Sequence, residues 1–221
     1  MKVRVKYEKG DRVRFLGHLD VQRVVQIAAS RAGWPLEMSQ GYNPRPKFSF
    51  YSPLPAGTAG REECFDAVLS KPWSLKDLAR SLSRALPEGF SLHEVREAPQ
   101  REEPFESRIA ASSYGLDLKG VNIRELSRAL DAFMAEDVVP FVVVRPKEKK
   151  SVDLRPFVLH IGEPEAVSEE RIVLNMTLGH DEGRTVRPQW VLGSLAQFGL
   201  NLDPREAIID RRKILLGQRE N

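Results

Sequence analysis

Residues 2–33 read KVRVKYEKGDRVRFLGHLDVQRVVQIAASRAG, and the spacing of their apolar side chains changes partway along. In residues 2–7, valine and tyrosine alternate with lysine and arginine, which is the period of a half-exposed strand. From His18 to Ala32 the apolar residues recur at helical spacing, and Gly33 is suited to end the helix. A strand followed directly by a helix indicates a mixed α and β fold.

The remainder of the first half continues this pattern. Further strands are expected at residues 46–51 and 61–69, joined by a loop rich in proline and glycine. Ser74 is a suitable N-cap for a second helix, and residues 90–96 are expected to form a closing strand. The order β-α-β-β-α-β is that of the ferredoxin-like unit, in which two helices cover one face of the sheet and the other face is open.

The second half repeats this order of elements. Residues 99–107 are rich in proline and charge, and we interpret them as a linker. A strand is expected at residues 110–118, followed by a helix capped by Asn122. Strand-like segments follow, then a helix that begins at Pro188 and a last strand at residues 207–216.

We therefore predict an α+β protein made of two tandem ferredoxin-like (βαββαβ) units with antiparallel sheets. The N-terminal unit, with a basic surface, is placed at residues 1–98, and the C-terminal unit at residues 108–221. A length of 221 residues allows two small domains, and 41% hydrophobic with 29% charged residues is typical of a packed globular protein. Because the halves share no convincing sequence identity, the duplication is inferred from the pattern alone.

Three features of the sequence favour a cytoplasmic protein. The first residues alternate charged and β-branched side chains with no apolar block after them, so we expect no secretory signal. No segment approaches the length of a membrane span, and the single cysteine, Cys64, excludes an internal disulfide. We also predict no cofactor and no metal site, because the histidines lack the spacing of metal ligands: His18, His93, His160 and His180.

Positive charge is concentrated near the N-terminus. Residues 1–50 contain ten Lys and Arg against four Asp and Glu, a local net charge of +6, although the whole chain carries +3. Such an asymmetry suits a phosphate-rich partner, and it is also typical of a solvated basic face.

The loop at residues 39–47, SQGYNPRPK, holds the most informative set of side chains. Tyr42 is suited to stack on a base, two amides to pair with base edges and two cations to hold phosphates, as in single-stranded RNA recognition. The alternative is a turn shaped by glycine and prolines, with solvated cations. The candidate RNA-binding residues of this loop are Gln40, Tyr42, Asn43, Arg45 and Lys47.

Further candidate RNA contacts lie outside the loop. Strand alternation places Arg4 and Lys6 on the open face of the first sheet beside Tyr51, where they would form a basic surface unless two sheets pack together there. The complete candidate set outside the loop is Arg4, Lys6, Arg14, His18, Tyr51 and Arg155.

The segment VDLRP at residues 152–156 supplies the last of these candidates. In a strand, Asp153 and Arg155 would share one face, where they form an ion pair or where Arg155 contacts a phosphate. The alternative is a pair of solvated hairpin charges.

His18 and Asp20 stand at the start of the first expected helix. Asp20 is suited to cap free backbone amides and to interact with the helix dipole. Histidine ordinarily titrates near neutrality, so His18 is a candidate general acid or base towards an RNA 2′-hydroxyl, although the sequence identifies no catalytic partner for it.

Four motifs stand together in this chain: RFLGHLD at 14–20, MSQGYNPRPK at 38–47, PLPAG at 53–57 and VDLRP at 152–156. They closely resemble an uncharacterised bacterial domain-of-unknown-function family described as radical-SAM-linked or radical-SAM-associated. The resemblance implies a protein encoded beside, or fused to, a cobalamin-binding-type radical SAM protein, often near a ribonuclease of the E/G type, and it implies no established activity. This chain lacks the three-cysteine cluster motif, so such chemistry would belong to a partner.

Three functions are therefore considered. The leading hypothesis is a non-catalytic RNA-binding accessory protein that presents a structured or single-stranded RNA, such as tRNA or rRNA, to a radical SAM partner. The second is a protein–protein adaptor that docks on a radical SAM protein without RNA contact. The third is a metal-independent endoribonuclease that uses His18. Neither a membrane nor DNA is predicted as a partner.

Overall fold

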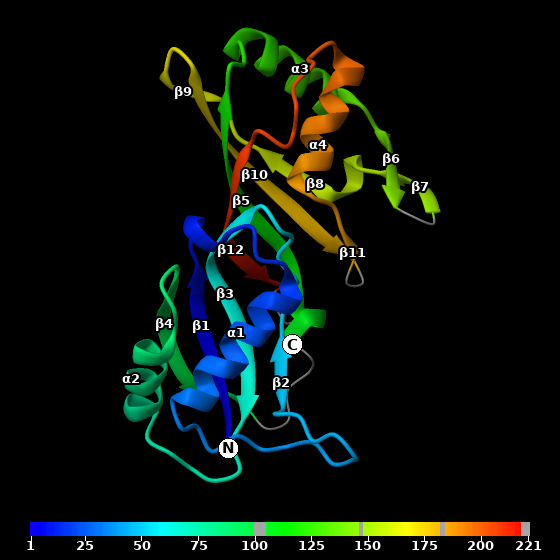
Figure 1. Cartoon of the computed structure of the whole chain (residues 1–221). Coiled ribbons are helices and arrows are strands. Elements are labelled where there is room, and N and C mark those ends of the chain that lie inside the picture. The colour runs from blue at the N-terminus through cyan, green and yellow to red at the C-terminus, as the bar shows by residue number, and fades with distance from the viewer. Residues whose placement is uncertain (100–104, 146–147, 182–183, 218–221) are drawn as a thin grey trace. The chain divides into compact units, whose positions relative to one another are not determined.

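The computed structural model describes residues 1–99, 105–145, 148–181 and 184–217 (Figure 1). The chain divides into two compact units, Met1–Arg108 (unit 1) and Ile109–Asn221 (unit 2). This division falls beside the expected linker at residues 99–107, of which residues 100–104 lie outside the described residues. The described part of the chain is an α+β protein with mostly antiparallel strands and four α-helices.

The described residues of unit 1 form four strands, two α-helices and two short 3-10 turns. In chain order these are β1 (Lys2–Lys9), η1 (Asp11–Val13), α1 (His18–Arg31), β2 (Phe48–Phe50), β3 (Thr58–Val68), α2 (Leu75–Ala85), β4 (Phe90–Glu97) and η2 (Phe105–Arg108). The strands lie in the order β2-β3-β1-β4, and every pair among them is antiparallel.

One face of the unit 1 sheet packs against α1 and α2 (Figure 1). Val5 on β1 lies opposite Phe65 on β3 and Val95 on β4, and all three contribute to the core. The helices add Val25 from α1 and Leu82 from α2, both fully buried. The period of two along each strand therefore sends the intervening residues, such as the cations of β1, to the opposite face.

Unit 2 contains more strands than unit 1. In chain order it has β5 (Ile109–Lys119), α3 (Ile123–Ala135), β6 (Pro140–Arg145), β7 (Glu148–Asp153), η3 (Arg155–Phe157), β8 (Val158–Ile161), β9 (Glu165–Ser168), β10 (Arg171–Asp181), β11 (Arg184–Thr185), α4 (Pro188–Ser194), η4 (Leu195–Phe198) and β12 (Ile208–Leu216). β5 lies between β10 and β12, and the short strands β8, β9 and β11 pair with β10. β6 and β7 form a separate two-stranded hairpin.

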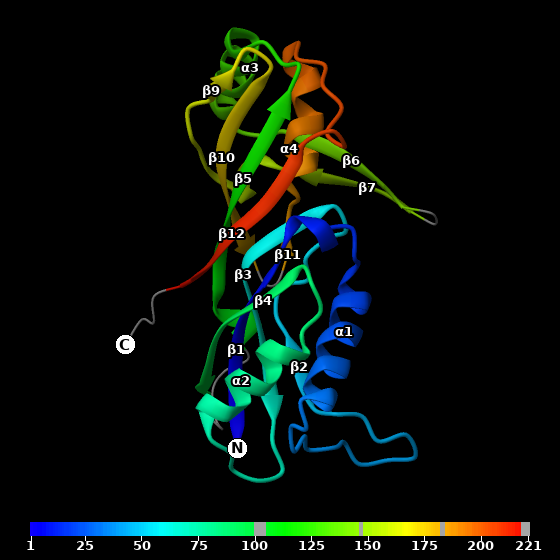
Figure 2. The same cartoon turned by 60° about the vertical axis from the view of Figure 1, so that its left-hand side comes forward.

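The core of unit 2 repeats the arrangement of unit 1. Leu116 on β5 lies opposite Leu174 on β10 and Ile209 on β12. These side chains pack with Phe133 of α3 and Val191 of α4, and Figure 2 shows both helices on the same side of the strands of this unit. In each unit the first strand thus lies between the second long strand, β3 or β10, and the last one, β4 or β12.

Helix caps follow the local sequence. The Ser74 hydroxyl accepts a hydrogen bond from the Asp77 amide at 3.4 Å, and Asn122 Oδ1 accepts two backbone amides at 2.9 and 3.3 Å. α1 instead begins after Gly17, which makes no side-chain cap hydrogen bond. Asp20 lies in its first turn, where a carboxylate interacts favourably with the helix dipole.

One expectation about unit 2 is wrong. Asp153 and Arg155 do not share a strand face, because β7 ends at Asp153 and Arg155 opens the turn η3. Pro156, the second residue of η3, has no amide hydrogen to continue a strand ladder.

None of the described helices is long and apolar enough to cross a membrane.

Candidate functional site

The loop between α1 and β2 is closed at its base by hydrogen bonds. The amide of Ser39 donates to the Arg45 carbonyl at 2.8 Å, and the Ser39 hydroxyl accepts from the Arg45 amide at 3.0 Å. The amide of Lys47 donates to the Glu37 carbonyl at 2.9 Å, and Met38 and Pro46 form an isolated bridge. The base of the loop is therefore ordered by its own backbone.

The tip of the same loop is open to solvent. Every residue from Gln40 to Arg45 is exposed, and Tyr42 is fully exposed. Gly41 has φ 125°, in the region that favours glycine, so the turn at the tip depends on that residue. Figures 1 and 2 show this light-blue loop extending from the rest of unit 1. Four of the five loop candidates, those of the tip, are thus presented together.

Lys47, the fifth loop candidate, is held beside an acid. Its Nζ lies 2.5 Å from Glu37 Oε1, and this hydrogen bond lowers the pKa of Glu37. Arg45, by contrast, makes no ion pair with any residue of the described ranges. The exposed cation of the tip is therefore Arg45.

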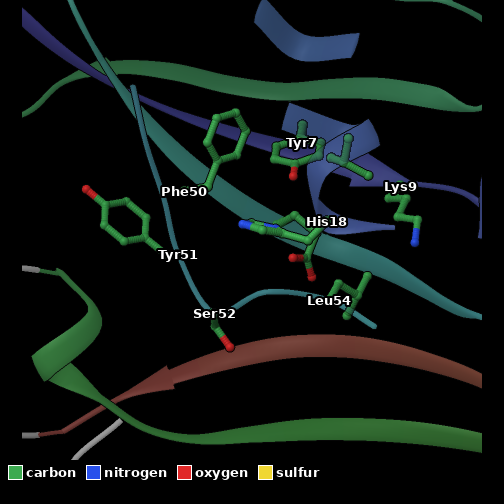
Figure 3. A pocket seen from close by; sticks show the side chains of 9 residues that line it. Tyr7, Lys9, His18, Phe50, Tyr51, Ser52 and Leu54 are labelled. Carbon is green, nitrogen blue, oxygen red and sulfur yellow. The ribbon is translucent and has the colours of Figure 1, made fainter. Parts of the chain in front are cut away.

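His18 lies in a different place, at the N-terminal end of α1. Its ring is 2.8 Å from the Gln22 amide nitrogen and meets Phe50 edge-on at a centroid distance of 6.1 Å (Figure 3). It lines a pocket with Lys9 and Tyr51, and the cavity volume of about 10 Å³ has room for about one water molecule. A cavity of this size does not admit a nucleotide.

Lys9 in this pocket has a structural role. Its Nζ donates to the carbonyls of Arg14, Leu16 and Thr58 at 2.8, 2.8 and 3.0 Å. The first two bonds fix the chain between β1 and α1, and the third ties Lys9 to the start of β3. In the segment between β1 and α1, the Arg14 guanidinium lies 5.0 Å from the ring centre of exposed Phe15.

Arg4 and Tyr51 belong to a buried network on the face of the sheet opposite the helices. Arg4 Nε and Nη2 donate to the two carboxylate oxygens of Asp66 at 2.8 and 3.0 Å. Lys2 Nζ lies 2.9 Å from the same carboxylate, and Tyr51 is hydrogen-bonded to it. Arg4 is 2% exposed and Asp66 1% exposed, so the guanidinium is committed to Asp66.

The pKa values of this network reflect burial and pairing. Burial by itself would raise the pKa of Asp66, but hydrogen bonds from Arg4, Tyr51 and Lys2 outweigh it and hold that pKa below its usual value. Burial raises the pKa of Tyr51, and it raises the pKa of the neighbouring Cys64 thiol to about 12. Neither the phenol nor the thiol ionises near neutral pH.

Lys6 and Arg155, two other candidates, also have protein partners. Lys6 Nζ lies 3.9 Å from a Glu94 carboxylate oxygen at the surface, which is a weak pair. The Arg155 guanidinium donates to the carbonyls of Val158 and Met134 at 3.1 and 3.4 Å. It therefore connects η3 to α3 within unit 2.

The candidate residues thus lie in separate places. The loop tip follows the C-terminal end of α1, whereas His18 begins that helix, and a 14-residue helix spans roughly 20 Å. Arg4 and Lys6 lie on the face of the unit 1 sheet that points away from the helices, and Arg155 lies in unit 2. The structure brings together the loop candidates at the surface, and it brings Tyr51 together with Arg4 and with His18 in the interior of unit 1. RNA contact by each residue stays a prediction.

An exposed stripe along α1 was missed by the sequence interpretation. Leu19 is 75% and Ile27 45% exposed, and with Arg23 and Arg31 they recur every four residues along one side of the helix, here called the α1 stripe. Phe15, just before the helix, is also exposed. No other described helix exposes a large apolar side chain. The sequence contained a signal for this stripe, because Leu19 and Ile27 fall outside the helical spacing of the apolar residues that were expected to be buried.

In the described part of the chain, no group of three or more His, Cys, Asp or Glu side chains is arranged to hold a metal ion.

Fold and site together define a two-unit α+β protein that presents an exposed polar and aromatic loop from unit 1. The chain belongs to the family described as "Uncharacterized protein conserved in bacteria (DUF2344)", whose model matches residues 2–188. Among solved structures it is similar to a chain of "Crystal Structure of a Cbf5-Nop10-Gar1 Complex", with 9% identity and a TM-score of 0.49. That match covers 95% of this chain and 47% of the other, so this protein spans about half the length of its structural neighbour. No curated protein matches the chain.

Proposed function

We propose that this protein binds RNA through the loop tip of unit 1 and presents it to a partner enzyme. The observation that carries the proposal is the full exposure of Tyr42 on a loop whose base is closed by hydrogen bonds. Tyr42 buries no surface against the protein, so its ring is available to another molecule, and binding residues are often placed on loops that a rigid scaffold positions.

The side chains around Tyr42 suit a single-stranded RNA segment. An aromatic ring stacks on any base, and the amides of Gln40 and Asn43 match the hydrogen-bonding edges of bases. Arg45, which has no acidic partner among the described residues, is suited to a phosphate. Lys47 adds positive charge at the base of the loop, but its ammonium group is paired with the Glu37 carboxylate.

The partner and the finer fold class belong to the same proposal. The antiparallel strand order, with the first strand between the second long strand and the last in both units, supports two tandem ferredoxin-like units. The family resemblance of the motifs supports a radical SAM protein as the partner. With one cysteine, this chain would contribute RNA binding and the partner would contribute the chemistry.

The test is the affinity of the purified full chain for total RNA from its host, measured over a range of salt concentrations. We expect Tyr42→Ala to weaken binding by about 5- to 100-fold through lost stacking. Arg45→Glu should weaken it by about tenfold and flatten its salt dependence. Arg84→Glu is the matched control, since Arg84 is an exposed arginine on α2 of the same unit. Wild-type protein without salt-sensitive binding, or loop variants that bind like the control, would overturn the proposal.

A second function, a protein–protein adaptor, is favoured by the α1 stripe. Leu19 and Ile27 offer apolar surface, and Arg23 and Arg31 make no ion pair with a described residue. Such a surface matches a partner that is apolar at its centre and acidic at its rim, and we assign that partner as the radical SAM protein. Co-purification of the two proteins after ribonuclease treatment tests this function. Co-purification should be lost when Arg23→Glu and Arg31→Glu are combined, and it should be retained in the loop variants. The reverse result would exclude the α1 stripe as the docking surface.

A further inference from the structure

The hairpin of β6 and β7 is separate from the larger sheet of unit 2. Its residue pairs run from Pro140 opposite Asp153 to Arg145 opposite Glu148 without a register shift. Neither strand pairs with a third strand among the described residues, and Figures 1 and 2 show the hairpin extending from the rest of the unit. Both outer edges of the hairpin are therefore unpaired within the ranges that the structure describes.

The base of this hairpin is fixed to the core of unit 2. The ring of Phe141 stacks on Trp190 of α4 at a centroid distance of 6.3 Å. Gln197 Nε2 donates to the Pro140 carbonyl at 3.1 Å. The rest of β6 is thus positioned by its packed base, as is typical of binding segments on a rigid scaffold.

Alternate residues of β6 direct their backbone groups away from β7. The Val139 carbonyl accepts from the Leu154 amide at 2.9 Å, on the β7 side, whereas the next carbonyl, that of Pro140, is bound from outside the hairpin. In an antiparallel pair this alternation continues along the strand. Val142 and Val144 therefore direct N–H and C=O outward, and neither forms a hydrogen bond with a described residue outside the hairpin.

The side chains of β6 do not protect this edge. Exposed edge strands usually carry lysine, proline or a bulge that prevents pairing with another chain. Beyond Pro140 at the base, residues 141–144 read FVVV, with no charge and no bulge. Val142 is 57% and Val144 68% exposed. This outer edge, here called the β6 edge, is therefore suited to accept a further strand.

Positive charge beside the β6 edge limits which strand it accepts. Residues 145–150, RPKEKK, contain four cations and one acid. Lys149 and Lys150 of β7 are exposed, and neither forms an ion pair with a described residue. An added strand would lie two strand spacings, about 10 Å, from β7, and a lysine and a glutamate side chain together span that distance. Acidic side chains on the added strand would therefore be stabilised.

We propose that the β6 edge binds an extended segment of a partner protein by strand addition, and that this segment alternates β-branched with acidic residues. Its main chain forms hydrogen bonds with Val142 and Val144, and its β-branched side chains cover these valines. Its acidic side chains pair with Lys150 on the other face of the hairpin. RNA suits this edge less well, because valine neither stacks on a base nor bonds to a base edge. This surface goes beyond the proposed function, since its ligand is a protein.

The experiment measures binding of the full chain to a fluorescein-labelled peptide of sequence TVEVEVT. A second peptide of the same sequence has N-methylated internal amides, so it keeps the side chains and lacks the main-chain donors. We expect the first peptide to bind at low salt and the second to bind at least about tenfold more weakly, because several hydrogen bonds are lost.

Variants of the hairpin locate the binding edge. Val142→Pro removes one outward donor, at a position where an edge strand tolerates proline, and should weaken binding of the first peptide at least about fivefold. Val142→Thr keeps the donor and the branched side chain, so a change below about threefold is expected of this matched control. Lys150→Glu should weaken binding at least about threefold at low salt. Lys119→Glu, at an exposed lysine of the same unit, is its matched control.

Every outcome supports or overturns this inference. Absence of peptide binding, equal binding of the N-methylated peptide, or wild-type affinity in Val142→Pro would exclude strand addition. Loss of RNA binding in Val142→Pro would assign the hairpin to RNA, and wild-type dimers that dissociate in this variant would assign it to a second copy of the chain. Either result overturns the acidic partner.

Two controls separate folding and RNA binding from this test. Circular dichroism verifies that each variant is folded, and if Val142→Pro is not, the N-methylated peptide and Lys150→Glu decide the outcome. The variants of the unit 1 loop should bind the peptide as the wild type does. A failure of the RNA proposal therefore leaves the β6 edge unaffected, and a failure of the β6 edge leaves the RNA proposal unaffected.

Discussion

The two units have the same strand order, but they differ in the sheet face that points away from the helices. In unit 1 this face carries a buried ion pair between Arg4 on β1 and Asp66 on β3. In unit 2 a pair on the corresponding face joins Asp117 on β5 to Arg171 on β10, and the Arg171 side chain is 50% exposed. Similar cross-strand pairs therefore exist in two different dielectric environments.

The helix surfaces differ in the opposite sense. The outer side of α1 carries the apolar Leu19 and Ile27, whereas α3 exposes polar residues such as Arg124 and Arg128. Unit 1 thus buries charged side chains on its sheet and exposes apolar side chains on α1. The shared strand order determines which face forms the core, but it does not determine which of the remaining surfaces is available to a partner.

The largest difference between the units is expected from removing the carboxylate of each pair. Asp66→Asn should lower the free energy of unfolding by about 3–5 kcal/mol, because it leaves Arg4 buried without a counter-charge. Asp117→Asn should cost about 1 kcal/mol or less, because Arg171 remains hydrated. Urea unfolding followed by circular dichroism measures both. Equal costs would contradict the contrast between the two faces.

The same pair predicts a dependence on pH. The folded-state pKa of Asp66 lies below its unfolded value of about 3.9, so its stabilisation is present above about pH 4 and is lost as the pH falls through the folded pKa. The difference in stability between wild type and Asp66→Asn should therefore be constant from pH 7 to 5 and shrink below pH 4. A difference that grows on acidification would contradict this assignment.

Unit 2 should begin to lose stability at a higher pH than the Asp66 network of unit 1, and the cause is His180. Burial, with a smaller effect of Arg211, lowers the pKa of His180 to about 4, and its ring lies 3.1 Å from the Ser112 hydroxyl. The unfolded histidine takes up its proton near pH 6.5, so stability is lost progressively from about pH 6.5 down to 4. Unfolding monitored by Trp190, the single tryptophan of unit 2, should show this loss, and His180→Asn should remove it. An unchanged slope in the variant would contradict it.

The sequence allowed prediction of those features that depend on neighbouring residues. Alternation in residues 2–7 located β1, and helical spacing located α1. The N-cap predictions for Ser74 and Asn122 are confirmed by hydrogen bonds from amides within three residues. The N-cap of α1 is Gly17 instead of Asp20, which lies in the first turn of that helix. In the loop, the grouping of Gln40, Tyr42, Asn43 and Arg45 follows from their adjacency in the chain.

The features that the sequence interpretation missed depend on residues far apart in the chain. Arg4 was expected on an open basic surface, but its partner Asp66 lies 62 residues away. A usable signal was present, because Asp66 stands between Phe65 and Ala67 in an apolar strand, where a lone carboxylate requires a partner. The position of Arg212, whose guanidinium would meet a Cβ added to Gly115 at 2.5 Å, likewise depends on an irregular strand register that no local pattern encodes.

The helix caps provide a further comparison of the two units, with smaller expected changes in the free energy of unfolding. Asn122→Ala should lower the free energy of unfolding by about 1 kcal/mol, since two amides of α3 lose their acceptor. Gly17→Asn should raise it by a few tenths of a kcal/mol, since α1 has no side-chain cap and a Cβ at position 17 makes only an ordinary 3.5 Å contact with Asp20. Urea unfolding at pH 7 resolves the signs, and a destabilising Gly17→Asn would contradict the prediction.

The smallest effect on stability is expected on the α1 stripe. Leu19 is the second residue of α1, and α3 has Arg124 at its second position. Leu19→Arg should change the free energy of unfolding by less than about 0.5 kcal/mol, because its side chain is exposed and arginine is a good helix former. A loss above 1 kcal/mol would mean that Leu19 is covered in solution. If the substitution is silent in the isolated protein, any weakening of partner binding in Leu19→Arg must come from the interface itself, and α1 then differs from α3 in function rather than in packing.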